Sequence, residues 1–144
     1  MTLTNQHKFQ VRFSDLDANR HLRNTAYSEF AAQSRFNLLH EMGFTMKDLA
    51  AAKIGPIIFS EHAAYHAETL LGDQVIVHTY LAEMSESGHK WQFKHEIYKN
   101  TKTLAAVLTT TGAWMNLSER RVAAPPEALR DKFNELPQGH LDEK

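Results

Sequence analysis

Hydrophobic and polar residues alternate near the start of the chain and then give way to a dense polar segment. Phe9, Val11 and Phe13 alternate with polar neighbours across residues 8–13, which predicts a half-buried strand. Residues 14–23 show no periodicity and are rich in aspartate, asparagine, arginine and histidine. We therefore expect an opening strand followed by a polar loop.

A long helix is predicted after this loop, over residues 25–42. Apolar residues recur there at a spacing near 3.6, which is the period of a helix with one buried face. Asn24 and Thr25 are both good N-cap residues, and Gly43 is a natural stop. A second, short helix is expected over residues 45–53, with Thr45 as its cap.

The rest of the chain predicts strands and a last helix. Four stretches are rich in β-branched or aromatic residues, and Gly-Asp, Ser-Gly and Asn-Thr pairs separate them like hairpin turns: 57–68, 74–84, 89–98 and 103–117. This order favours a four-strand antiparallel meander. Two prolines at residues 125–126 precede a helical pattern that runs to about residue 136.

These elements predict an α+β domain in which the long helix packs on a curved antiparallel sheet. A chain of 144 residues suffices for one core, so we expect a single domain over residues 1–144, with residues 136–144 as a polar tail. The strand near residues 104–115 is apolar on both faces, which is typical of a central strand or of a face covered by a partner.

Composition narrows the classes of function. The net charge is −1, which disfavours a nucleic-acid or anionic-membrane partner. The absence of cysteine excludes thiolate nucleophiles and zinc–thiolate sites. No stretch reaches the roughly 20 apolar residues that span a bilayer, and the start lacks the apolar run of a signal peptide. We expect a cytoplasmic protein.

The densest candidate chemistry lies in residues 15–24, between the first strand and the long helix. A helix N-terminus presents unpaired N–H groups that stabilise an oxyanion, and a nearby carboxylate can activate a nucleophile. Such a pair suits attack on a carbonyl group. Loops with aspartate and asparagine before a helix are also common for structural reasons, because these side chains form turns and caps.

The stretch VRFSDLDANRHLRNTAYSEFAAQSRF, residues 11–36, carries a family resemblance. It resembles the opening motif of the 4-hydroxybenzoyl-CoA thioesterase-like acyl-CoA thioesterases, which have the hotdog fold. Gly72-Asp73 before a strand resembles a second step of that family. The resemblance implies hydrolysis of an acyl-CoA substrate by a homodimer, or a dimer of dimers, with active sites between subunits and with no metal or cofactor.

The resemblance also implies roles for individual residues. Asp17 matches the catalytic carboxylate, either as the nucleophile or as the holder of the hydrolytic water. Asn24 matches the helix start whose backbone N–H polarises the thioester oxygen. Asp15 matches a position that braces the loop, while His21 and Tyr27 match positions that shape the loop or line the acyl pocket.

Two residues depart from the family pattern, and two acids are held in reserve. Arg20 stands where the pattern has glycine, which can adopt a positive φ more readily than arginine. Arg23 stands where the pattern has asparagine. Glu29 and Glu61 are reserve acids, because other hotdog branches take their catalytic acid from the helix or the partner subunit.

Other interpretations stay open at this point. Asp17 and His21 resemble, imperfectly, the aspartate and histidine of the hotdog hydratases. The departures at Arg20 and Arg23 leave room for a non-catalytic acyl-thioester-binding protein. His62 and His66 stand four apart but lie in a predicted strand, which disfavours a metal pair. The histidines of the later strands are expected to be ordinary strand residues: His78, His89 and His95.

Overall fold

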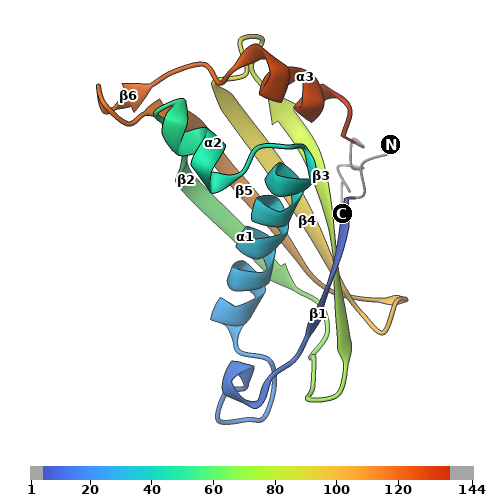
Figure 1. Ribbon diagram of the computed structural model, residues 1–144. Helices are drawn as coiled ribbons and strands as arrows, with labels where there is room; N and C mark the ends of the chain where they lie inside the picture. Colours follow the sequence, from blue (N-terminus) through green and yellow to red (C-terminus); the bar gives the residue numbers. More distant parts are fainter. Residues whose placement is uncertain (1–4, 137–144) are drawn as a thin grey trace.

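A long helix lies across one face of a curled antiparallel sheet in the computed structural model, which describes residues 5–136 (Figure 1). The predicted α+β arrangement is confirmed. The helices are α1 (Asn24–Glu41), α2 (Met46–Ala51) and α3 (Glu127–Asn134), with a short 3-10 helix η1 (Phe13–Asp15). The strands are β1 (Gln6–Gln10), β2 (Ile54–Tyr65), β3 (Gln74–Met84), β4 (Lys90–Lys99), β5 (Thr103–Asn116) and β6 (Arg121–Val122). No helix in residues 5–136 is long and apolar enough to cross a membrane.

The order of strands corrects the predicted meander. The sheet runs β1-β3-β4-β5-β2, with β6 on β5, so β2 lies beside β5 and not beside β3. The chain crosses from the end of β2 to the far part of the sheet, and Gly72-Asp73 precedes β3 without joining two neighbouring strands. Turn residues indicate where a chain reverses direction, but they do not indicate which strand the following strand will pair with.

The first strand is shorter and earlier than its alternation predicts. β1 ends at Gln10, and Phe13 lies in η1 with 82% of its surface exposed. Phe9 faces the helix and stacks on Phe30, with ring centroids 4.9 Å apart. The alternation therefore identified the inward face correctly up to Val11, which is buried.

The helix boundaries agree with the expected ones to within two residues, but the cap of α1 does not. Arg23 is the N-cap residue of α1 and makes no side-chain cap hydrogen bond, so the expected caps Asn24 and Thr25 lie inside the first turn. Thr45 does cap α2, where it and Asp48 form a reciprocal capping box. The predicted tail falls almost entirely outside the described residues.

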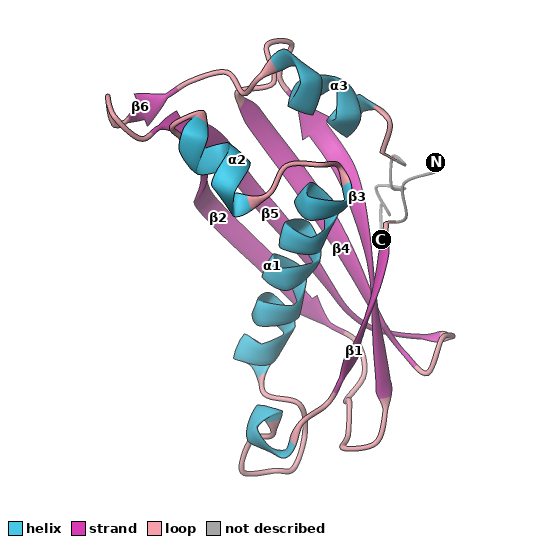
Figure 2. Cartoon of the chain, in the orientation of Figure 1, coloured by secondary structure: helices cyan, strands magenta, loops and turns pink. Residues whose placement is uncertain are grey.

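The core has two parts, one under each half of α1. The first packs Tyr27 and Phe30 of α1 on Val75, Val77 and neighbouring strand residues. In the second, α3 closes over the end of the sheet beside the last turns of α1, as Figure 2 shows. β5 lies between β4 and β2, so it is a central strand and both of its edges are hydrogen-bonded to neighbours. The sheet and helix together hold the β1–α1 loop against the first turn of α1.

Candidate active site

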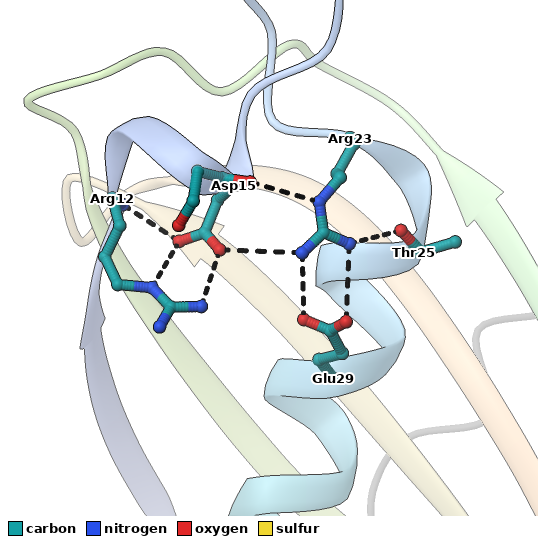
Figure 3. Close-up of polar contacts among 6 residues, drawn as sticks. Arg12, Asp15, Arg23, Thr25 and Glu29 are labelled. Atoms are coloured by element: carbon teal, nitrogen blue, oxygen red, sulfur yellow. Dashed lines mark hydrogen bonds and ion pairs between the residues drawn. The ribbon is translucent and has the colours of Figure 1, made fainter.

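The loop between β1 and α1 is built around a buried carboxylate, Asp15. Arg12 donates three hydrogen bonds to it (Figure 3). The backbone N–H and Nε of Arg12 lie 2.9 and 3.1 Å from Oδ2, and Nη2 lies 2.8 Å from Oδ1. Asp15 is fully buried, yet hydrogen bonds from Arg12 lower the pKa of its carboxyl. Asp15 thus stays ionised and braces the loop.

Arg23 ties this loop to the first turns of α1. Its Nη2 lies 3.2 Å from Oε1 of Glu29 and 3.8 Å from Oδ1 of Asp15, and its Nη1 donates to the Thr25 hydroxyl (Figure 3). Its Nε donates to the Ser14 carbonyl at 3.4 Å. Glu29 is therefore engaged by Arg23, which makes it a structural partner in this arrangement.

One carboxylate oxygen of Asp17 stabilises a turn of the loop, and the other is free of hydrogen bonds from the described residues. Its Oδ1 accepts hydrogen bonds from the backbone N–H groups of Asn19 and His21, at 2.8 and 3.0 Å. No donor among the described residues bonds Oδ2. Arg20, between Asn19 and His21 in the same loop, has φ +64°. An arginine thus adopts the left-handed conformation for which glycine is better suited. A non-glycine residue therefore occupies the left-handed position in this loop.

Asp17 shares a shallow surface depression of about 410 Å³ with the start of α1. Its lining also includes several residues that the motif suggested, His21, Asn24 and Tyr27, together with Leu22, Tyr65, His66, Ala67 and Glu68. The loop is held to this wall by a hydrogen bond from the Leu22 N–H to the Thr69 carbonyl, at 2.7 Å. The depression therefore gathers Asp17, His21, Asn24 and Tyr27, while Asp15, Glu29 and Glu61 are not among its lining residues.

The N-terminus of α1 is open toward ligands. Asn24 is the first helical residue, so its N–H has no acceptor within the helix. Arg23 supplies no side-chain cap, and the first turn contains no acidic residue. The positive end of the helix dipole is thus not neutralised by a cap in the helix itself.

The sequence did not single out Tyr65 or Glu68 as lining residues, and it suggested His66 only as half of a disfavoured metal pair. They lie at and just beyond the end of β2, more than 40 residues after Asp17, and only the crossover places them here. Glu68 Oε2 lies 2.8 Å from His21 Nε2, and the Tyr27 hydroxyl donates to Thr69 at 3.0 Å. Burial raises the pKa of Tyr27, which therefore stays a neutral hydrogen-bond donor.

Glu61, an exposed residue of β2, belongs to a different polar network. Its carboxylate accepts hydrogen bonds from Ser28 at 2.5 Å and from Thr110 at 3.3 Å. His62 lies on strand β2 as expected, and residues 5–136 contain no group of three or more histidine or acidic residues placed to hold a metal ion. His89 lies in the turn before β4, not on a strand.

Comparison with family models places the chain in one family. The sequence matches the thioesterase-like superfamily over residues 11–133. Comparison with curated proteins gives no match. Solved structures give many matches, of which three illustrate the range.

A Staphylococcus aureus protein solved in complex with CoA is 20% identical, with a TM-score of 0.88 over 99% of this chain and 92% of that chain. A 1,4-dihydroxy-2-naphthoyl-CoA thioesterase from Synechocystis is 16% identical, with a TM-score of 0.80 over 90% of this chain and 94% of that one. A DHNA-CoA thioesterase from Staphylococcus aureus is 15% identical, with a TM-score of 0.79 over 91% and 87% of the two chains. These likenesses show that the chain has the hotdog fold.

Proposed function

The chain belongs to the thioesterase-like superfamily, and from this premise we propose that it hydrolyses acyl-CoA thioesters to a free carboxylic acid and CoA. The observation that carries the proposal is the shared depression, in which the free oxygen of Asp17 and the open N-terminus of α1 line the same wall. The matched structures include a protein in complex with CoA and two acyl-CoA thioesterases, which supports CoA esters as the substrate class.

In the proposed reaction, the two parts act on the two ends of the thioester carbonyl group. The Asn24 N–H and the helix dipole stabilise the negative charge that develops on the carbonyl oxygen. Asp17 Oδ2 takes a proton from a water molecule that attacks the carbonyl carbon, or attacks that carbon itself to form an anhydride that water then opens. In either route the C–S bond breaks and CoA leaves as its thiol. A cytoplasmic location, where CoA thioesters are available, belongs to the same proposal.

Substitution of Asp17 tests this proposal directly. Asp17→Asn keeps the shape of the side chain but removes the base or nucleophile, so we expect kcat to fall by about 10²–10⁴. A thiol reagent measures released CoA across short, long and aromatic acyl-CoA esters. The protein contributes no background, because the chain contains no cysteine.

Asp131→Asn is the matched control, because Asp131 is an exposed residue of α3 far along the chain from the depression. We expect it to hydrolyse at the parental rate. Equal rates in Asp17→Asn and the parent would contradict the proposed role of Asp17. Binding of the esters by the parent without any turnover would instead identify a non-catalytic binder.

We also propose that two copies pair through β2. This strand forms the edge of the sheet beside β5, and its exposed side chains include Ile58 and Phe59, which are 53% and 55% exposed. An open edge strand with apolar side chains favours pairing with another strand, and a two-fold pair uses the same edge of both copies. A pair of such dimers is the larger assembly that the resemblance implies.

Mass measurement in solution tests the pairing. Light scattering after size-exclusion chromatography should give a dimer, or a tetramer, for the parent. Phe59→Lys should shift the mass toward the monomer, because a charge at the edge opposes strand pairing. A parent that runs as a monomer at high micromolar concentration would be evidence against the pairing.

A further inference from the structure

A buried histidine of β4, His95, faces the middle of α1. Its side chain has no exposed surface, and both of its ring nitrogens are engaged. Nη1 of Arg35, on α1, lies 2.9 Å from Nε2, and Oγ1 of Thr79, on β3, lies 3.3 Å from Nδ1. A guanidinium can only donate, so Nε2 accepts from Arg35 and Nδ1 carries the hydrogen that Thr79 accepts. These contacts define a neutral imidazole in a single tautomer.

The same Arg35 nitrogen begins a chain of contacts that ends at Glu61 of β2. Nη1 also donates to the Thr110 hydroxyl, 3.2 Å away, and that hydroxyl donates to Glu61 Oε2 at 3.3 Å. Glu61 Oε1 accepts from the Ser28 hydroxyl at 2.5 Å. Ser28 and Arg35 are seven residues apart, so they lie on the same face of α1. The network therefore ties this face of the helix to four strands of the sheet.

Two members of the network carry charge, Arg35 and Glu61. Among the described residues Arg35 forms no ion pair, and Glu61 acts on it from behind Thr110, where it favours the charged guanidinium. The other neighbours of the imidazole are uncharged: Thr79 on β3, Phe93 on β4 and Leu108 on β5. Arg35 is only partly buried, so its guanidinium can move outward, whereas the His95 ring is enclosed.

We propose that His95, Arg35 and Glu61 form a proton-driven switch, in which protonation of His95 transfers the Arg35 guanidinium to Glu61. A solvent proton bound at Nε2 turns this nitrogen into a donor that faces the donor Nη1, and both groups are then positively charged. Their contact is lost, and Arg35 moves toward the acid of the network. The place that Nη1 leaves lies between Nε2 and the Thr110 hydroxyl, where a water molecule can accept the new N–H bond.

The neutral state of the switch predominates at pH 7. Burial, and then the Arg35 charge, hold the pKa of His95 well below 6.5. Arg35 therefore stays on His95 near neutral pH and leaves it only as the pH falls.

Movement of Arg35 changes the wall of an apolar cavity. This cavity, of about 200 Å³, lies under the C-terminal half of α1, and Arg35 lines it together with the rings of Trp91 and Trp114. When Arg35 turns to Glu61, the wall loses its side chain and the cavity becomes wider. Acid is therefore expected to open the interior beneath α1 while the fold stays intact.

NMR of the histidine side chains tests the starting state. Two-bond proton–nitrogen spectra distinguish the two neutral tautomers from the charged ring, and the signals of His95 are those that His95→Gln lacks. We expect the Nδ1–H tautomer at pH 7 and the charged ring in acid, with the far-UV circular dichroism still native. The Nε2–H tautomer at pH 7, or unfolding while His95 is still neutral, would overturn the proposal.

Substitutions at the two charged residues should move this titration in opposite directions. Arg35→Met removes the cation, so the proton affinity of His95 should rise about tenfold or more, while Arg35→Lys should keep it close to the parental one. Glu61→Gln removes the destination of Arg35, so the affinity should fall. Asp131→Asn, at an exposed position of α3, is the matched control and should leave it unchanged. Thermal melting establishes that each variant is folded. An unchanged proton affinity in folded Arg35→Met or Glu61→Gln protein would contradict the switch.

Tryptophan emission tests the movement of the cavity wall, because the chain contains only two tryptophans and both line the cavity. Quenching by acrylamide should increase in step with the protonation of His95 in the parent and stay constant with pH in His95→Gln. The same pH dependence of quenching in both proteins would show that His95 does not control the cavity, and the proposal would then be wrong.

Discussion

Replacement of Asp15 by asparagine should destabilise the loop that carries the candidate active site. Asp15 is fully buried and accepts three hydrogen bonds from Arg12. An asparagine can keep one acceptor oxygen but turns an NH2 group toward the Arg12 donors. Hydrogen bonds to charged groups contribute about 1.5–3 kcal/mol each, and an unpaired buried group costs about 1–3 kcal/mol.

The net loss is expected to be about 2 kcal/mol, because Arg12 itself is 64% exposed and water replaces part of its bonding. For a domain of this size the entropy of unfolding is about 0.3 kcal/mol per kelvin, so the loss lowers the melting temperature by about 7 °C. Asp131→Asn, which removes an exposed carboxylate of α3, should change it by less than about 2 °C.

The pH dependence gives a second test of the same contact. The folded-state pKa of Asp15 is lowered, first by hydrogen bonds from the Arg12 side chain. Its contribution is therefore present above the unfolded pKa, near 3.8, and is lost as pH falls through the folded pKa. The difference in melting temperature between the parent and Asp15→Asn should have its full size at pH 7 and should become smaller below about pH 4. A gap under about 2 °C at pH 7, or one equally large at pH 3, would refute the reasoning.

Two further substitutions test the interior. His95 is buried, and burial and Arg35 hold its pKa well below 6.5, so the parent should lose stability in urea as pH falls below about 6.5. His95→Gln should reduce that loss of stability. An equal dependence of the unfolding free energy on pH in both proteins would contradict the role given to His95. Gly112→Ala would place a Cβ 2.1 Å from the Ile57 carbonyl oxygen and 2.6 Å from the Trp91 ring, so its melting temperature should fall by more than about 10 °C. A fall of under about 3 °C would show that the β2–β5 pairing can shift at no great cost.

Local patterns predicted the elements well because each depends on nearby residues. Strand β3 has the expected bounds, and α1 begins and ends one residue from them. The place of β2 in the sheet depends on the segment that follows it, because that segment crosses the sheet before β3 begins. The sequence of this segment does not indicate which strands it connects. Strand pairing is decided by packing over the whole domain, so sequence alone predicted the strand and not its neighbour.

The candidate site divides in the same way. Asp17 and Asn24 are only seven residues apart in the sequence, with the end of the loop between them. Their closeness in space therefore follows from their closeness along the chain. His66 and Glu68 reach the depression only because the end of β2 lies beside the first turn of α1.

Arg23 links the departure from the family motif to the chemistry of the helix start. An asparagine, aspartate, serine or threonine at an N-cap places its own oxygen on the N–H groups of the first turn, and this contributes about 1 kcal/mol to stability. Arg23 cannot accept such a bond, so the protein forgoes that contribution and leaves the N–H groups of the first turn without a side-chain cap. Its charge is turned instead toward Glu29 and Asp15, which hold the loop against the helix. The residue that departs from the motif therefore keeps both the loop anchored and the proposed oxyanion site open.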